Sequence, residues 1–340
     1  MLKSIIRIAA SVLGAVLLLA GCAKTLDPAQ AGGNFPISFS AGSSLLRDDV
    51  TKAAYPDNTS FGVFAYKGNM NGSNNNLAPG FMFNVEVTHS GAAYTYSPTR
   101  FWPDVSEKLH FWAYSPYSAS PVLYKAGVGS TTEFTSATKG IPDIQYTADG
   151  HTDFMVSDVV KNQTSDTNSG LVVIPFNHAL SMVNVSVVKV DPTSKYTVKL
   201  KAVRFDGIYS TAVLRSSGWA DWSGARGNLV LYSDDPADNT DDITLTTSAA
   251  PLQTVIPLPQ ELTNAAARLH VEFSVSYAGI LHERTTAREV LLSKVFEDVG
   301  AHWEKNKHYT LELRVSPDDP IEFTVSWSDW GDVFNYQITS

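Results

Sequence analysis

The only cysteine of the chain is the residue whose type and position most clearly predict a chemical modification. Cys22 ends the sequence Leu19-Ala20-Gly21-Cys22, after two basic residues and an uncharged, mostly apolar stretch over residues 8–20. This order is typical of an export signal. Leu-Ala-Gly-Cys matches a lipobox, in which the cysteine is acylated and becomes the first residue of the mature chain. We therefore expect residues 1–21 to be a lipoprotein signal peptide and Cys22 to carry the lipid.

Two alternatives for this N-terminus stay open. An ordinary signal peptide could carry a cysteine at this place by chance. A transmembrane helix would need ~20 consecutive apolar residues, and the apolar stretch before Cys22 is shorter than that. The lipobox favours an exported chain that is anchored by its lipid.

Composition and charge exclude several classes of function. Acylation would use the only thiol, so the mature chain could form no disulfide and no cysteine-based catalytic or zinc site. The formal net charge is −9, and it becomes −11 without residues 1–21, which contain two basic residues and no acidic one. Nucleic-acid binding depends on a basic surface, so this charge argues against nucleic-acid partners. The length of 340 residues fits two domains better than one.

No catalytic constellation stands out in the rest of the sequence. The eight histidines are scattered without metal-site spacing, and the chain has neither a nucleophile elbow nor a glycine-rich phosphate loop. We therefore expect a protein without enzymatic activity or cofactor. The acidic cluster in Ser233–Asp242 could hold calcium, but it lacks regular ligand spacing and the glycine of a calcium loop, which favours a solvated loop. We expect His178 to be a packed, hydrogen-bonded residue and most tryptophans to be core residues.

Alternation of apolar and polar residues is the dominant pattern, and it predicts half-buried β-strands, because successive strand side chains point to opposite faces. The residues expected to face the core in five such segments are Phe81, Phe83, Val85 and Val87; Val183, Val185 and Val187; Tyr196, Val198, Leu200 and Ala202; Val271, Phe273, Val275 and Tyr277; and Tyr309, Leu311, Leu313 and Val315. Helical periodicity is limited to two short candidates, at 259–267 and 288–297. The pattern indicates an all-β protein built of antiparallel β-sandwiches.

The domain organisation follows from breaks in this pattern. Residues 22–33 are small and polar with two glycines, so they predict a flexible tether between lipid and fold. The polar segment Asp191-Pro192-Thr193-Ser194 separates two runs of strands. We place an N-terminal β-sandwich at 34–190 and a C-terminal β-sandwich at 195–340.

Five segments, in order along the chain, resemble motifs of the fimbrillin family of Bacteroidales, the subunits of type V pili. They are an aromatic-Trp-Pro segment, a Phe-x-Ala-Tyr-x-Pro strand, an Asp-Leu-Met-Val-Ala-like segment, a Phe-x-His-Ala-Leu strand and a Trp-x-x-Gly-x-x-Tyr-like turn. Here they read Phe101-Trp102-Pro103, Leu109–Pro116, Asp153–Ser157, Phe176–Val183 and Trp303–Tyr309. Asn306 stands where the family has glycine, a mild departure because asparagine also tolerates a left-handed backbone.

The resemblance implies a fold and a route of assembly. Members of this family have two tandem transthyretin-like antiparallel β-sandwich domains and are exported as lipoproteins without a cofactor. A protease specific for arginine or lysine then cuts a loop after the first strand. Loss of that strand opens a groove, which the C-terminal strand of a neighbouring subunit fills. The implied partners are other fimbrillin subunits, the processing protease, the outer membrane through the lipid, and host or bacterial surface ligands.

The residues at both ends of the sequence are compatible with that route. Phe35, Ile37 and Phe39 alternate with polar or small residues as a short first strand, and the polar segment after it contains Arg47 and Lys52. We expect cleavage at Arg47 first and at Lys52 second. A C-terminal segment repeats the pattern of three apolar residues, and its members are Phe334, Tyr336 and Ile338. These residues are the predicted donor strand, although both segments could also be permanent strands of their own domains.

The sequence thus predicts a pilus subunit at the cell surface, structural or adhesive in role. The alternative is a surface glycan-binding lipoprotein of a polysaccharide-uptake system, which would show coplanar exposed tryptophans. A calcium-dependent adhesin that uses Ser233–Asp242 is a third hypothesis.

Overall fold

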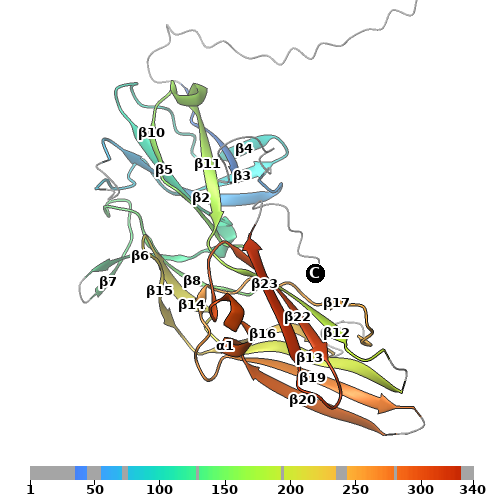
Figure 1. Cartoon of the computed structure of the whole chain (residues 1–340). Coiled ribbons are helices and arrows are strands. Elements are labelled where there is room, and N and C mark those ends of the chain that lie inside the picture. The colour runs from blue at the N-terminus through green and yellow to red at the C-terminus, as the bar shows by residue number, and fades with distance from the viewer. Residues whose placement is uncertain are drawn as a thin grey trace, which may run out of the picture. The chain divides into compact units, whose positions relative to one another are not determined.

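The computed structural model describes residues 35–43, 55–70, 76–127, 130–192, 195–234, 243–278 and 282–330. β-strands and their connections make up nearly all of this part of the chain, which confirms the predicted all-β class (Figure 1). Its helical segments are short: η1 (Tyr117–Ala119), η2 (Thr167–Gly170), α1 (Leu292–Val295) and η4 (Glu297–Val299). No helix among these residues has the length and apolar character needed to cross a membrane. The signal peptide, the tether at 22–33 and Cys22 lie outside the described residues.

The largest sheet comes from the N-terminal part of the chain and has the order β1-β11-β9-β5-β2-β3-β4, with β10 also paired to β5. Its strands are β1 (Ser38–Ser43), β2 (Thr59–Lys67), β3 (Met82–Ser90), β4 (Ala93–Tyr96), β5 (Leu109–Ser115), β9 (Met155–Ser157), β10 (Val160–Gln163) and β11 (Leu171–His178). Every residue of β5 is buried, because both faces of this central strand are covered. β1 lies at one edge of the sheet.

A second sheet has the order β15-β14-β8-β6-β7. Its strands are β6 (Val122–Gly127), β7 (Ser130–Glu133), β8 (Asp143–Thr147), β14 (Thr211–Arg215) and β15 (Gly218–Ser223). β14 pairs with β8, so strands from both sides of residue 190 meet in this sheet. Residues 33–340 also form one compact unit. The division into domains at 34–190 and 195–340 therefore does not coincide with a division between sheets, and it stays a prediction.

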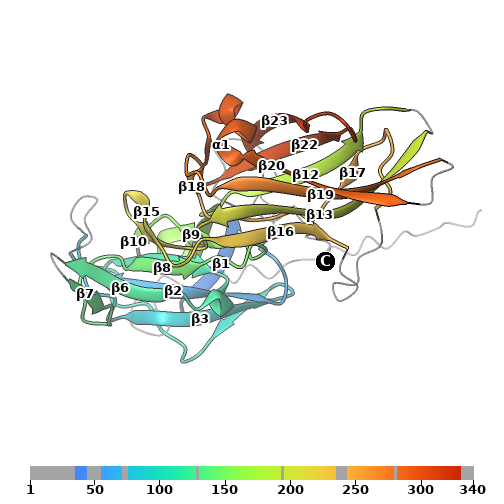
Figure 2. The same ribbon diagram turned by 90° about the horizontal axis from the view of Figure 1, so that it is seen from below.

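Two further sheets come mainly from the C-terminal part of the chain. One has the order β17-β12-β22-β23 and the other the order β16-β13-β19-β20 (Figure 2). The first contains β12 (Met182–Lys189), β17 (Ala250–Pro251), β22 (Lys307–Val315) and β23 (Glu322–Asp329). The second contains β13 (Tyr196–Ile208), β16 (Gly227–Ser233), β19 (Arg268–Tyr277) and β20 (Glu283–Leu291). A short pair, β18 (Gln260–Glu261) with β21 (His302–Trp303), completes the strands described here.

Two pairings are parallel, which differs from the predicted antiparallel arrangement. β1 runs parallel to β11, with Ser38 opposite Leu171, and β12 runs parallel to β22, with Met182 opposite His308. A hairpin cannot join parallel neighbours, so each pair must come from segments far apart in the sequence. Alternation within one segment carries no information about such a partner.

Two of the predicted strands change face part-way along. In β3, Val87 and Met82 are buried while Phe83 is 36% exposed, because one extra residue shifts the register against β2. Asn84 takes a left-handed backbone at this point (φ +47°). The same kind of register shift in β13 buries Val203 in place of the predicted Ala202. A β-bulge reverses the alternation beyond it, which explains both errors.

The other predicted core residues are largely where alternation placed them. Val183, Val185 and Val187 are buried, as are Val271, Phe273, Val275 and the four apolar residues predicted for β22. Of the two candidate helices, 259–267 contains β18 instead, whereas 288–297 contains the end of β20 and α1.

Candidate assembly site

Among the described residues, the first strand has a single neighbour in the large sheet. β1 pairs with β11 from Ser38 opposite Leu171 to Ser43 opposite Phe176, and its other side is the edge of the sheet. Just before it, Ile37 N–H donates to Arg100 O and Trp102 N–H donates to Phe35 O, both at 2.9 Å. The backbone of β1 is therefore attached to the body through one ladder and a short bridge at its start.

Apolar side chains of this strand and of the residues just before it belong to the core. Ile37 and Phe39 are 2% and 4% exposed, and the half-buried Phe35 packs against the same core. The Phe39 ring makes edge contacts with the rings of Tyr96, Phe111 and Phe61, at centroid distances of 5.4, 5.8 and 6.4 Å. The predicted first strand thus exists from Ser38 onward, with its apolar side chains facing inward.

The aromatic-Trp-Pro motif locks the start of this strand. Trp102 is 3% exposed, and its indole Nε1–H donates to Gly170 O at 3.1 Å. Because Gly170 directly precedes β11, Trp102 links the bridge beside Phe35 to the strand that pairs with β1. The Tyr96 hydroxyl also donates to Ile37 O at 2.9 Å.

The predicted cleavage sites Arg47 and Lys52 fall outside the described residues, between Ser43 and Tyr55. The ends of this segment are fixed. Tyr55 is 1% exposed, and its hydroxyl lies 2.6 Å from Ser115 Oγ and donates to Ser60 O. Burial raises the pKa of Tyr55 to about 12. The residue after the segment is thus as firmly packed as the strand before it.

At the other end of the chain, Trp330 is the last described residue and is 1% exposed. Its ring stacks on the buried His178 with a centroid distance of 3.8 Å and an interplanar angle of 1°. His178 Nδ1–H donates to the Asp153 carboxylate at 2.9 Å. Two of the resembling motifs, Asp153–Ser157 and Phe176–Val183, therefore meet beside Trp330. The predicted donor residues Phe334, Tyr336 and Ile338 lie beyond the described residues.

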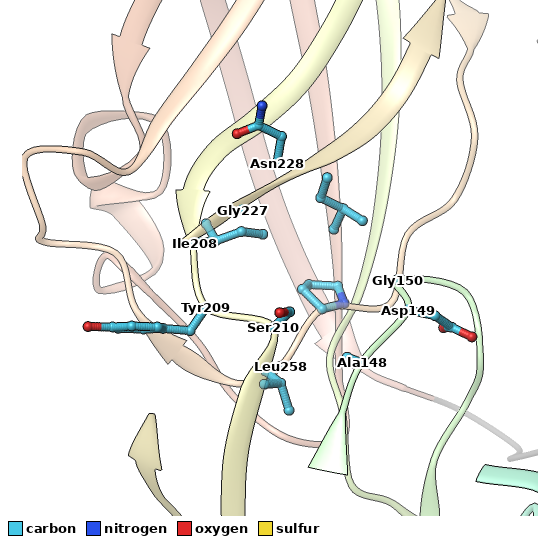
Figure 3. A pocket seen from close by; sticks show the side chains of 11 residues that line it. Ala148, Asp149, Gly150, Ile208, Tyr209, Ser210, Gly227, Asn228 and Leu258 are labelled. Atoms are coloured by element: carbon cyan, nitrogen blue, oxygen red, sulfur yellow. The ribbon is translucent and has the colours of Figure 1, made fainter. Parts of the chain in front are cut away.

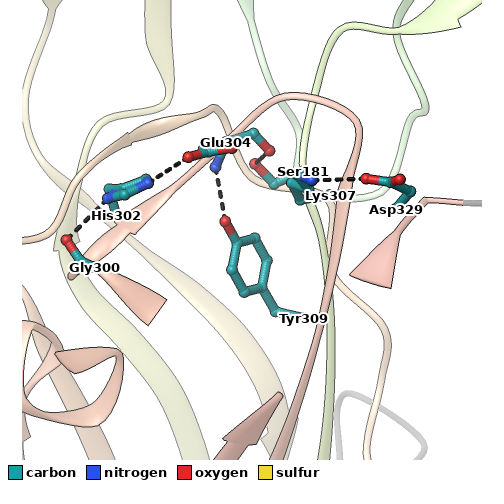
Figure 4. Close-up of polar contacts among 7 residues, drawn as sticks. All are labelled: Ser181, Gly300, His302, Glu304, Lys307, Tyr309 and Asp329. Atoms are coloured by element: carbon teal, nitrogen blue, oxygen red, sulfur yellow. Dashed lines mark hydrogen bonds and ion pairs between the residues drawn. The ribbon is translucent and has the colours of Figure 1, made fainter. Parts of the chain in front are cut away.

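The turn just before β22 makes further polar contacts beside the stacked His178 and Trp330 rings (Figure 4). Asn306 adopts the predicted left-handed backbone (φ +59°). Its N–H donates to Leu180 O, and its carbonyl accepts from Trp330 N–H at 3.0 Å. Beside it, Ser181 Oγ donates to Glu304 O at 2.8 Å, and Lys307 Nζ donates to Asp329 Oδ1 at 2.7 Å. Alternation within one segment could not predict these contacts, since the residues that make them come from separate segments of the sequence.

The described residues contain no group of three or more His, Cys, Asp or Glu side chains able to hold a metal ion. Most of the Asp-rich segment Ser233–Asp242 lies outside them. One small pocket, of about 120 Å³, lies beside Gly150, Ser210 and Leu258 (Figure 3). Its single carboxylate, on Asp149, already accepts hydrogen bonds from the backbone N–H groups of His151 and Thr152. This pocket therefore offers no free acid for catalysis.

The tryptophans were expected to be mostly core residues, and Trp102, Trp112, Trp303 and Trp330 are 5% exposed or less. Trp222 and Trp327 are 37% and 52% exposed, but they belong to β15 and β23, in different sheets. The Trp222 indole donates to Pro259 O, and Lys307 Nζ lies 3.9 Å from the Trp327 ring centroid. These two rings thus give no support to a coplanar platform for a sugar.

Comparison with known proteins agrees with the motifs. Over 158 residues the chain is 31% identical to the fimbrium subunit Fim1C of Phocaeicola vulgatus, a match over 42% of this chain and 40% of that protein. It thus spans about two-fifths of that relative's length. The crystal structure of a fimbrial protein from Bacteroides vulgatus has a TM-score of 0.66 at 19% identity, covering 87% of this chain and 100% of that one.

A candidate cell adhesion protein from Bacteroides uniformis has a TM-score of 0.52 at 15% identity, covering 87% of this chain and 99% of that one. Both solved structures therefore have the same fold as this chain. Residues 50–330 match the family model described as Fimbrillin-like. This match covers most of the sequence, so the chain belongs to the fimbrillin-like family.

Proposed function

We propose that this protein is a non-enzymatic subunit of a cell-surface pilus, exported as a lipoprotein precursor with its lipid on Cys22. A trypsin-like protease cuts the precursor at Arg47 or Lys52, and the subunits then polymerise by strand exchange. Membership of the fimbrillin-like family supports the role as a pilus subunit.

The observation that carries the assembly step is the position of β1. Among the described residues it is an edge strand with one partner, yet its Phe39 and the preceding Ile37 are buried in the core, and the segment with both candidate cleavage sites follows it at once. Cleavage there would leave β1 bound to the body by non-covalent contacts alone. Departure of the strand would expose the backbone edge of β11 and the apolar residues beneath it, including Phe61 and Phe111.

The vacated groove suits another strand with alternating apolar residues. Backbone hydrogen bonds would supply general affinity, and side chains in the pockets of Phe35, Ile37 and Phe39 would fix the register. Phe334, Tyr336 and Ile338 of a neighbouring subunit have the same spacing. Burying each of them would stabilise the joint by about 1.5–3 kcal/mol. An open groove would be prone to aggregation, so keeping β1 in place until assembly protects the precursor.

Treatment of the detergent-solubilised precursor with trypsin tests the proposal. We expect one early cleavage between residues 43 and 55, followed by a ladder of polymers on electrophoresis without boiling. The matched control is the double variant Arg47→Gln/Lys52→Gln, which should stay uncut in this segment and monomeric. Polymers formed equally well by the double variant would exclude cleavage in this segment as the trigger.

A further inference from the structure

A cleft of about 370 Å³ opens beside β8, β14 and the turn before β22. Four cationic residues line it, Lys125, Lys139, Arg215 and Lys305, together with two acidic residues, Asp143 and Asp158. They come from separate parts of the sequence, namely β6, the connection before β8, β14 and the turn at 304–306. We call this the basic cleft.

The charge of the basic cleft is opposite to that of the chain as a whole. The chain has 34 acidic and 25 basic residues, whereas cationic residues outnumber acidic ones in the lining of the cleft. Asp143, Asp158 and Asp221, the ion-pair partner of Arg215, offset part of the repulsion among these cations, and a bound anion would offset the rest. A concave wall also concentrates the electrostatic field, which strengthens attraction for a small anion.

Several donors in the cleft are free to bind such an anion. Within the part of the chain that the structure describes, Lys139 and Lys305 make no hydrogen bond or ion pair, and both are exposed. Lys125 Nζ donates to a neutral acceptor, Ile141 O, at 3.2 Å. Arg215 pairs through Nη2 with Asp221, but its buried Nε has no hydrogen-bond partner.

We propose that the basic cleft binds a molecule that carries an oxyanion group, either the carboxylate or sulfate of an acidic sugar or a free inorganic oxyanion. Arg215 and the lysines supply the charge-assisted donors that such groups prefer. The volume lies within the range of ligand pockets, roughly 300–1,000 Å³. Trp112 and Ile144 supply apolar wall, against which the body of a small molecule can pack. This proposal is independent of strand exchange, because β1 contributes no residue to the lining.

Isothermal titration of the monomeric precursor with sialyllactose, lactose and sodium sulfate tests the proposal. We expect sialyllactose or sulfate to bind, lactose not to bind, and the affinity to fall as ionic strength rises. Tighter binding of sialyllactose than of sulfate would assign the acidic sugar, and binding of sulfate alone would assign the free oxyanion.

Three variants connect binding to this cleft. Lys139→Gln/Lys305→Gln should weaken binding by at least about tenfold, since it removes two donors to a charged group. Asp158→Asn should strengthen binding, because it removes a negative charge from the lining. Lys294→Gln is the control, since that exposed lysine pairs with Glu297 away from the cleft. The proposal would be overturned if neither sialyllactose nor sulfate bound, or if the double variant and the control bound with equal affinity.

Discussion

At the scale of single residues, His178 connects two of the resembling motifs to the last described residue of the chain, Trp330. Asp153 accepts a hydrogen bond from His178, whose ring stacks on Trp330. Burial raises the pKa of Asp153, and the contact with His178 opposes that rise. The packed, hydrogen-bonded role predicted for His178 is confirmed, but its stacking partner was not predictable because Trp330 comes from the far end of the chain.

Trp330→Ala should lower the free energy of unfolding by about 3–5 kcal/mol, because it leaves a large cavity beside His178. Urea denaturation followed by circular dichroism measures this change. Trp327→Ala is the matched control, since this side chain is 52% exposed, and it should cost less than about 1 kcal/mol. Equal effects of the two substitutions would contradict the anchoring role of Trp330.

His302 makes stability depend on pH in a predictable direction. Its hydrogen bond to Glu304, at 2.7 Å, raises the pKa of His302 above its usual value. The folded state therefore favours the protonated ring, and the stabilisation is fully present below the unfolded pKa, ~6.5, and is lost as pH rises through the raised folded pKa. The side chains are 30% and 53% exposed, so screening limits the effect to less than about 1 kcal/mol.

The free energy of unfolding, measured between pH 5.5 and 8.5 for the unmodified chain and for the His302→Gln variant, tests this pH dependence. The unmodified chain should be more stable than the variant at pH 5.5, and the difference in the free energy of unfolding should shrink toward pH 8.5. An advantage that grows with pH would show that the ring is neutral in the folded state.

At the scale of elements, alternation predicted where strands lie but not how they pair. The four predicted apolar residues of β22 and three of the four in β19 are buried as expected, and only Tyr277, the last residue of β19, is half-buried. In β3 and β13 a single extra residue reverses the faces. Such a bulge depends on the backbone of the neighbouring strand, so a pattern within one segment cannot reveal it. The inward side of β1 was predictable, whereas its single parallel neighbour, β11, was not.

Removal of residues 333–340 tests whether the C-terminal segment is a donor strand. If these residues act on a neighbour, the truncated precursor should keep its melting temperature and lose polymerisation after trypsin treatment. If they are a permanent strand, the deletion should expose apolar surface and cost several kcal/mol, comparable to the stability of a small domain. Thermal melting separates the two cases, and a melting temperature lowered by tens of degrees would contradict exchange.

At the scale of the whole molecule, the fold class and the family could be predicted from the sequence, since composition, alternation and five short motifs are local properties. The candidate assembly site could be predicted only in part. Phe35, Ile37 and Phe39 could be chosen from their spacing, but the locks supplied by Trp102 and Tyr55 depend on contacts with Gly170 and Ser115 across the fold. Contacts of this kind join residues far apart in the sequence, so no local pattern predicts them.

Cys22→Ser should prevent attachment of the lipid and leave an uncleaved or soluble precursor. Fractionation of cells into membrane and soluble parts, with immunoblotting, measures the result. The control is Ser11→Ala, within the apolar part of the signal, which leaves the sequence Leu19–Cys22 unchanged and should fractionate normally. Normal membrane association of the Cys22→Ser variant would exclude the lipid anchor.

The N-terminus of assembled subunits tests the whole sequence of steps from precursor to polymer. Arg47 and Lys52 lie in the polar segment between β1, which ends at Ser43, and the buried Tyr55, and polar connections between strands are where proteases commonly nick folded proteins. N-terminal sequencing of polymers should therefore begin at Asp48 or at Ala53. Two acidic residues follow Arg47 and can slow cleavage there by a trypsin-like enzyme. The Arg47→Gln variant should therefore shift the N-terminus of assembled subunits to Ala53 and change the rate of assembly little. Assembled subunits that still begin at Cys22 would show that β1 stays covalently attached, and strand exchange at its groove would then be excluded.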